Sequence, residues 1–346
     1  MEFKKRVYAF LLLTAVLLAL TAFSPYGALS VKPSAASERP VLVPGGTPFG
    51  IKFFTRGVIV VGVTDIETYD GIASPAKDAG IRSGDIIIAV NGTRVNTSEE
   101  LGEAVNASKG EATVFTVQRG NETFNVTLKP KRSVSDGVYR SGLWVRDSTA
   151  GIGTVTYVNA QTGGFGGLGH GICDAETSAP LPLLRGVVTD VKITGIVKGR
   201  KHEPGELKGE FSHTVAGTLE KNTECGVFGT LNDISEYTAE PMEICYAGEM
   251  KTGKAYIMTT IDGGEPRLYE IRIVRIYENS GSTKNFLLEV TDKTLLEKTG
   301  GIVQGMSGSP VIQDGRLCGA VTHVMINDPE RGYGIFIENM LSAAQS

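Results

Sequence analysis

The sequence is poor in cysteine, with four in 346 residues: Cys173, Cys225, Cys245 and Cys318. This count is low for a domain held together by disulfides, although an even number in an exported protein would permit them. Buried free thiols that pack as small hydrophobic groups are equally compatible with the count. Compact pairs of Cys and His, typical of zinc sites, are absent. A metal site around His170 and Cys173 is therefore the weaker alternative, and we expect neither a metal nor a cofactor.

The sequence also lacks a strong excess of charge. It has 34 basic and 38 acidic residues, a formal net charge of −4, and no long basic run after the first few residues. Nucleic-acid binding usually requires a basic patch or stripe. We therefore expect no nucleic-acid partner.

The N-terminus begins with Lys4-Lys5-Arg6 and continues as a nearly uninterrupted apolar run to Phe23. Residues 1–24 are therefore predicted to be a signal peptide or a signal-anchor, which places the rest of the chain outside the cytoplasm. Residues 25–45 are rich in Pro, Ser, Ala and Gly, which is typical of a flexible linker.

A compact module is predicted over residues 46–130. Residues 57–63 read as a strand, 74–81 as a short helix ending at a glycine, and 98–107 as an amphipathic helix capped by Ser98. The run from Pro75 to Ile87 resembles the helix-to-strand signature of PDZ domains. That resemblance places Phe49, Gly50 and Ile51 in the loop that binds a peptide's terminal carboxylate. Alternatively, Phe49 and Ile51 are core residues, or the module holds a segment of its own chain.

Residues 137–346 show few helical patterns and many short alternating stretches separated by glycine and polar turns. This pattern is typical of an all-β barrel or sandwich. About 200 residues is the size of a chymotrypsin-like double β-barrel. The predicted fold is therefore mainly β, with a PDZ-like module followed by a peptidase domain of this kind.

Two glycine-flanked motifs indicate serine chemistry. In Gly305-Met306-Ser307-Gly308-Ser309-Pro310 the glycines allow a tight turn around Ser307, the candidate nucleophile. The backbone amides of Gly305 and Ser307 could then form an oxyanion hole. In Gly167-Leu168-Gly169-His170-Gly171 no helical or strand pattern explains the histidine. We predict His170 as the base, because a serine hydroxyl needs one to attack at neutral pH.

Other residues compete for the supporting roles. His202 lies in a charged segment, His213 alternates within a strand, and His323 follows the serine strand and could line the site. Spacing does not decide which carboxylate would orient the imidazole. The candidates are Asp174, Asp190, Asp233, Asp262 and Asp292.

The tract from Thr291 to Tyr333 resembles the SpoIVB peptidase family of spore-forming bacteria, and the loop around His170 resembles it too. The order of exported N-terminus, PDZ module and peptidase is also similar. This resemblance implies catalytic roles for Ser307 and His170, and it places the family's aspartate on Asp292. Asp292 precedes Ser307 by only fifteen positions (307 − 292), so it could instead be a turn residue that supports the serine loop.

The resemblance also implies a biological role. The chain would be exported, membrane-associated and located between the two forespore membranes. It would cleave its own N-terminal region and the extracytoplasmic part of a membrane complex. That cleavage would release an intramembrane protease that activates a late sigma factor.

Two other functions compete with this interpretation. A general envelope protease of the HtrA kind also combines a peptidase with a PDZ domain, but in the opposite order. An exported peptide-binding adaptor with an inactive peptidase domain is the non-enzymatic alternative. The presence of serine, histidine and the glycines at both loops argues against the adaptor.

Overall fold

The computed structural model describes residues 39–173, 178, 180–277 and 283–346. The predicted signal segment 1–24 and most of the predicted linker lie outside these residues. The last part of that linker is ordered, because Val41–Pro44 forms strand β1, which pairs with β11 and β16 (Met242–Glu243). Within the described residues, no helix has the length and apolar character needed to cross a membrane.

The first barrel closes through six antiparallel strands. In order around the ring they are β2 (Pro48–Val63), β11 (Leu143–Val158), β12 (Gly164–Gly167), β15 (Gly226–Leu231), β14 (Glu206–Thr223) and β13 (Leu183–Val197). The stretch of β2 from Pro48 to Thr55 pairs with β11 on one side and with β13 on the other. The ring is therefore continuous, and alternate side chains, such as Phe49, Ile51 and Phe53, are buried inside it.

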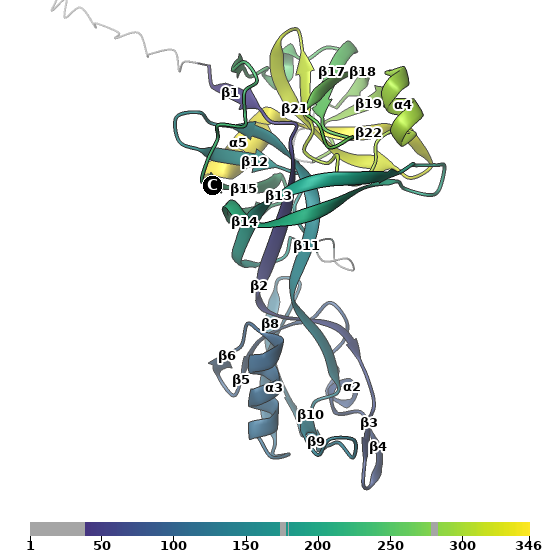
Figure 1. The fold of residues 1–346 in the computed structure, drawn as a ribbon. Helices are drawn as coiled ribbons and strands as arrows, with labels where there is room; N and C mark the ends of the chain where they lie inside the picture. The colour runs from purple at the N-terminus through teal and green to yellow at the C-terminus, as the bar shows by residue number, and fades with distance from the viewer. Residues whose placement is uncertain (1–38, 174–177, 179, 278–282) are drawn as a thin grey trace, which may run out of the picture. The chain divides into compact units, whose positions relative to one another are not determined.

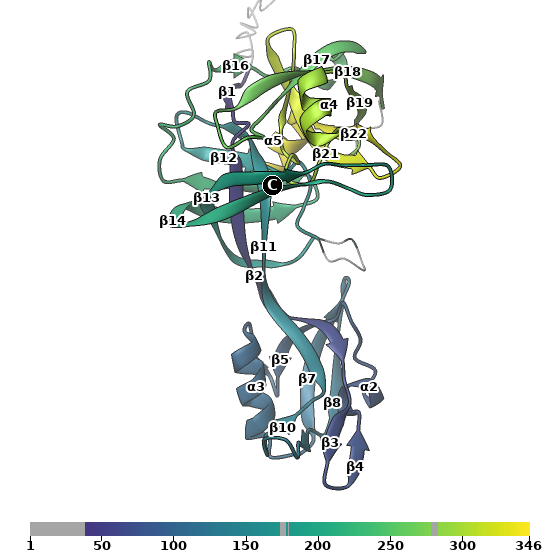
Figure 2. The same ribbon diagram turned by 45° about the vertical axis from the view of Figure 1, so that its right-hand side comes forward.

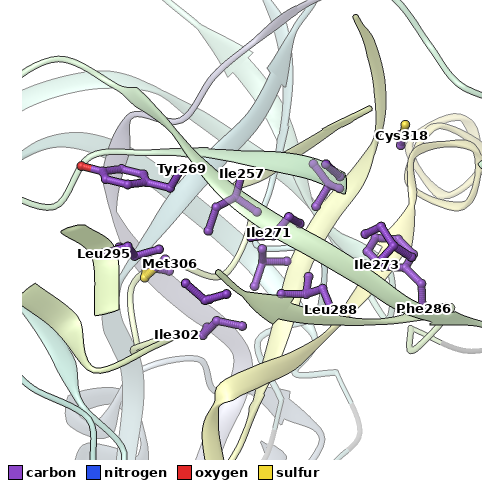
Figure 3. Packing of buried hydrophobic residues seen from close by; sticks show 14 of the residues in the cluster. Ile257, Tyr269, Ile271, Ile273, Phe286, Leu288, Leu295, Ile302, Met306 and Cys318 are labelled. Carbon is purple, nitrogen blue, oxygen red and sulfur yellow. The ribbon is translucent and has the colours of Figure 1, made fainter. Parts of the chain in front are cut away.

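The second barrel also has six strands. They are β17 (Gly253–Thr259), β18 (Arg267–Ile276), β19 (Phe286–Val290), β22 (Asp328–Phe336), β21 (Arg316–Met325) and β20 (Pro310–Gln313), which pairs back to β17 (Figure 1). Ile257, Ile271, Leu288 and Phe286 point into its interior (Figure 3). Three short helices belong to the same C-terminal part of the chain: η1 (Ala247–Glu249), α4 (Lys293–Thr299) and α5 (Ile337–Gln345). The predicted double β-barrel is confirmed.

The PDZ-like module lies between the two halves of the first barrel in sequence. It contains strands β5 (Ile86–Val90), β6 (Thr93–Arg94), β7 (Thr113–Arg119) and β8 (Glu122–Leu128), and helices α2 (Pro75–Asp78) and α3 (Ser98–Ala107) (Figure 2). The two-stranded pairs β3 (Ile66–Thr68) with β4 (Gly71–Ala73), and β9 (Lys131–Arg132) with β10 (Tyr139–Arg140), complete it. A separate apolar core holds it together, including Leu101, Val105 and Phe115.

The ends of the two helices of this module lie close to their predicted positions. The glycine stop after α2 is Gly80, with a φ of +75°. The cap of α3 lies one residue before the expected Ser98. Thr97 accepts a hydrogen bond from the Glu100 N–H, while the Glu100 carboxylate accepts from the Thr97 N–H, which is a capping box.

The structure changes the start of the predicted module but not the order of the two domains. We expected a module over 46–130 and then a separate peptidase domain over 137–346. In the structure, residues 48–55 belong to the first barrel, and the module is inserted between β2 and β11. The reason is long-range strand pairing, which local sequence patterns do not reveal.

Candidate active site

Strand β11 holds the loop that carries Ser307. The Thr154 N–H donates to the Ser307 carbonyl at 2.9 Å, and the Thr154 hydroxyl donates to the Gly305 carbonyl at 2.8 Å. The Thr156 hydroxyl donates to the Gly308 carbonyl at 2.7 Å. Both threonines are buried, so these bonds are shielded from competing water. The first barrel therefore holds, through these hydrogen bonds, a loop that belongs to the second barrel.

The backbone around Ser307 leaves two donors unused. Within the loop, the Met306 N–H donates to Val303 O and the Ser309 N–H to Met306 O. The N–H groups of Gly305 and Ser307 donate to no acceptor among the described residues. Two unpaired amides beside a nucleophile are what an oxyanion hole requires. The predicted pair is therefore available for this role.

Gly308 allows the serine loop to approach the histidine loop closely. Its φ is +96°, and a Cβ at this position would lie 2.0 Å from the Thr154 carbonyl oxygen and 2.5 Å from the Leu168 nitrogen. No side chain fits there. The glycine after the nucleophile is therefore needed for contact between the two loops.

His170 lies just after β12, and its ring has a defined hydrogen-bond partner. The Nδ1 atom is 2.9 Å from the Gly171 carbonyl oxygen. A carbonyl only accepts, so Nδ1 carries the proton, and Nε2 of the neutral ring is left as an acceptor. Burial lowers the pKa of His170 below its ordinary value, and the bond to Gly171 opposes this in part. The ring thus has the tautomer and charge of a general base.

The structure brings Ser307 and His170 to the same two cavities. One, of about 290 Å³, is lined mainly by apolar side chains of the first barrel, such as Ile51, Phe53 and Ile152. The other, of about 240 Å³, includes Val303, Val324 and Ile326. Two cavities therefore adjoin both the serine and the histidine.

The serine and histidine are not hydrogen-bonded to each other in this conformation. The Ser307 hydroxyl donates instead to the Thr322 carbonyl at 2.8 Å. Transfer of its proton to His170 requires the hydroxyl to leave this acceptor. Thr322, like Thr154 and Thr156, had no sequence signal that marked it as part of the site.

The Asp292 carboxylate is hydrogen-bonded to backbone amides and not to His170. It is the N-cap of α4, where its carboxylate accepts from the Leu295 N–H at 3.0 Å and from the Glu270 N–H at 3.4 Å. Among the described residues, no hydrogen bond joins any carboxylate to His170, and Asp174 lies outside them. The role of Asp292 as the orienting acid stays a prediction, and so does its alternative role in supporting the serine loop; in the structure its carboxylate caps α4.

His323 lies beside His170, with ring centroids 5.0 Å apart and planes at 37°. Burial lowers the pKa of His323 to about 4, with smaller contributions from His170 and Lys284. Its Nδ1 atom is buried and has no partner among the described residues. A neutral second histidine therefore packs against the candidate base, whereas His202 and His213 line neither cavity.

The cysteines are free thiols in the structure. Cys173 is exposed and lines the larger of the two cavities, whereas Cys245 and Cys318 are buried. The hydrogen bond with Cys245, and then burial, raise the pKa of Cys318.

The predicted carboxylate-binding loop at Phe49, Gly50 and Ile51 is wrong. These residues lie near the start of β2, paired on both sides, and Phe49 and Ile51 are buried in the first barrel. A Cβ on Gly50 would lie 2.4 Å from the Phe211 ring. The alternative, that Phe49 and Ile51 are core residues, is correct.

Comparisons with known proteins agree with this architecture. Residues 137–341 match the family model described as SpoIVB peptidase S55, and residues 48–129 match a PDZ domain. A probable periplasmic serine endoprotease, DegP-like, of Chlamydia trachomatis is 36% identical over 101 residues, which is 28% of this chain and 19% of that protein. The chain thus spans about a fifth of that relative's length.

Two solved structures give weaker similarity. The inactive form of the Rv3671c protease is 14% identical, with a TM-score of 0.33, over 56% of this chain and 85% of that one. The HtrA-type protease AlgW with a decapeptide is 13% identical, with a TM-score of 0.34, over 58% of this chain and 53% of that one.

Proposed function

Because the chain belongs to the SpoIVB peptidase S55 family, and is therefore a serine peptidase with a PDZ domain, we propose that it acts in sporulation. In this role it is exported to the space between the forespore membranes. There it cleaves itself and the extracytoplasmic part of a membrane complex, which releases an intramembrane protease that activates a late sigma factor. The family match and the resemblance of the serine and histidine loops support this proposal.

The observation that carries the catalytic assignment is the meeting of two loops 137 residues apart (307 − 170) at shared cavities. In the proposed mechanism, Ser307 Oγ attacks the scissile carbonyl carbon while His170 Nε2 accepts the hydroxyl proton. The negative charge that develops on the substrate oxygen is stabilised by the Gly305 and Ser307 amides. The imidazolium then donates its proton to the leaving amine.

A serine-directed fluorophosphonate tests the nucleophile. We expect labelling of the wild-type protein and none of Ser307→Ala. Ser309→Ala is the matched control, because Ser309 is fully buried and its hydroxyl donates to Met306 O at 2.7 Å. Labelling that depends on Ser309 rather than Ser307 would overturn the assignment.

The biological role is tested in the sporulating bacterium that encodes the chain. Replacement of the gene by Ser307→Ala should block self-cleavage and late sigma-factor activity without reducing the amount of protein. Normal late sigma activity in this strain would refute the role in sporulation. Digestion of unfolded casein with no effect on sporulation would instead favour a general envelope protease.

A further inference from the structure

Two cysteines of the C-terminal part of the chain lie on neighbouring extended segments. Ile244 and Leu317 form a parallel β-bridge, and the Cys245 N–H donates to the Leu317 carbonyl at 2.8 Å. In parallel pairing, the residues that follow a bridged pair by one position face each other in turn, on the opposite side of the two segments. Cys245 and Cys318 therefore occupy facing positions.

The burial of the four side chains agrees with this register. Ile244 and Leu317 belong to one cluster of buried side chains, whereas Cys245 and Cys318 belong to another, the core of the second barrel. Figure 3 shows Cys318 among the side chains of that core. Alternate residues of an extended segment face opposite sides. Both cysteine side chains therefore point into the same core.

The two thiol groups also contact each other. A hydrogen bond joins the side chains of Cys318 and Cys245. Each thiol has a second, weak contact with a backbone carbonyl: the Cys245 Sγ lies 3.6 Å from Tyr246 O, and the Cys318 Sγ lies 3.5 Å from Arg316 O. Within the part of the chain that the structure describes, no group of three or more His, Cys, Asp and Glu side chains could hold a metal ion. The pair therefore lacks the further ligands of a structural zinc site.

The backbone at these positions is compatible with a disulfide. A disulfide usually joins residues whose Cα atoms are about 4.4–6.8 Å apart. Neighbouring paired segments lie about 4.7–4.9 Å apart, which falls within this range for residues at facing positions. Both cysteines are reduced in the structure, and Cys318 is completely buried. Formation of the bond during folding, before the core closes, is therefore the accessible route.

We propose that Cys245 and Cys318 are oxidised to a disulfide when the folding chain meets a disulfide oxidant such as oxidised glutathione. The thiolate of one cysteine attacks a sulfur of the oxidant and releases one glutathione thiol. The second cysteine then attacks the mixed disulfide and releases the other. The two cysteines thus lose two electrons and two protons, which end on the two glutathione thiols. Export, which belongs to the proposed function, would bring the chain to a compartment where disulfides persist.

The bond would anchor the connection between the two barrels. Cys245 lies between β15 of the first barrel and β17 of the second, whereas Cys318 lies in β21. Four positions later in β21 is Thr322 (322 − 318), whose carbonyl accepts the hydrogen bond of the Ser307 hydroxyl. The closed loop spans 73 positions (318 − 245) and contains Ser307. A cross-link of this span restricts the unfolded chain, so we expect it to stabilise the second barrel.

Thiol counting tests the proposal on the full chain carrying Ser307→Ala, which prevents self-cleavage. The protein is unfolded in urea and refolded in a mixture of reduced and oxidised glutathione, so that burial of the thiols does not limit the reaction. After alkylation of the unfolded product, we expect two alkylated cysteines in the intact mass instead of four. Digestion with trypsin and a glutamate-specific protease separates Cys245 from Cys225 at Glu243. The digest should contain Cys245 and Cys318 in one linked pair of peptides.

Thermal unfolding of the oxidised and the reduced protein measures the consequence. Oxidation should raise the Tm by about 5–10 °C. Cys245→Ala should show no such rise, although the loss of a buried side chain lowers its Tm in both states. Cys225→Ala is the matched control, because Cys225 is half-buried and lies outside the pair, and it should show the full rise.

Three outcomes would overturn the proposal: four alkylated cysteines after refolding, a disulfide that includes Cys173 or Cys225 in place of this pair, or an equal rise in Tm for Cys245→Ala. All three are measured on protein without the candidate nucleophile. Failure of the disulfide therefore leaves the fluorophosphonate result on Ser307 unchanged, and the reverse also holds.

Discussion

At the scale of single residues, the site depends on how burial and backbone carbonyls set the state of two histidines. His170 donates from Nδ1 to a main-chain carbonyl, a partner that fixes the tautomer without adding a negative charge. Burial then keeps the ring neutral to a lower pH than in a free histidine. His323 beside it is kept neutral by the same cause.

The pH dependence of turnover follows from this state. A base must be neutral to accept the serine proton, and the pKa of His170 is lowered from its ordinary value of 6.5. We expect kcat/KM to fall on acidification only below about pH 6.5.

His170→Ala should lose on the order of 10³-fold or more in turnover. An acid limb above pH 7, or near-normal turnover of His170→Ala, would move the base to another residue.

His323 should make the folded state sensitive to acid. Its pKa is about 4 when folded and about 6.5 when unfolded, so the unfolded chain binds more protons between these values. The contribution to stability is complete above pH 6.5 and is lost as the pH falls toward 4, by on the order of 3 kcal/mol. Urea unfolding at several pH values measures this loss. His323→Gln should flatten the profile, and an unchanged profile would contradict the assignment.

Asp292 has a structural role that one substitution preserves and another removes. Asparagine caps helices about as well as aspartate, whereas alanine costs about 1 kcal/mol. We expect Asp292→Asn to unfold at nearly the wild-type urea concentration and Asp292→Ala at a lower one. Turnover of the asparagine variant then tests the orienting role. The family resemblance predicts a strong loss, and full activity would confine Asp292 to capping α4.

At the scale of elements, strand β11 runs from the module into the first barrel. No local sequence pattern indicates that one strand belongs to both. Its first residues, Leu143 and Val145, line a cavity of about 640 Å³ in the module. Its later residues, Thr154 and Thr156, hold the serine loop through their hydroxyl groups. A single strand thus contributes to the module and to the candidate active site.

The hydrogen bonds from β11 should matter for catalysis. Thr154→Val keeps the shape of the side chain but leaves the Gly305 carbonyl without its donor. We expect a drop in kcat of roughly tenfold or more with little change in KM, because a small misplacement of the loop weakens transition-state contacts. Thr218→Val, at an exposed position of β14, is the control and should be neutral. Equal effects of the two substitutions would argue against this account.

At the scale of the whole molecule, the module is an insertion into a barrel that closes without it. Phe54 pairs with Ser148, and the Thr55 hydroxyl lies 3.3 Å from the Asp147 carbonyl, so the two strands meet where the module departs. The barrel ring therefore depends on residues 48–55 and 148–154, not on those between.

Removal of the module tests this arrangement. Replacement of residues 56–146 by Asn-Gly should join β2 and β11 through a two-residue hairpin turn. We expect this variant to fold into the two barrels and to react with a fluorophosphonate at Ser307. Circular dichroism measures folding, and fluorophosphonate labelling measures reactivity at Ser307. A folded variant that does not react would show that the module takes part in assembling the site.

Local sequence patterns are enough to predict the serine and histidine loops with their glycines, the capped helix of the module and the mainly β character of the chain. These signals lie within a few residues of one another, where turn and capping preferences act. Only the tertiary structure decided that residues 48–55 belong to a barrel, that the module is inserted, and that Thr154, Thr156 and Thr322 surround the nucleophile. The alternating pattern of a strand's sequence is the same whichever strand it pairs with, so the pattern does not identify the partner. Its partner, β11, lies 96 residues away at Phe53 (149 − 53) and 104 at Phe49 (153 − 49), and is selected by the burial of these side chains in a shared core.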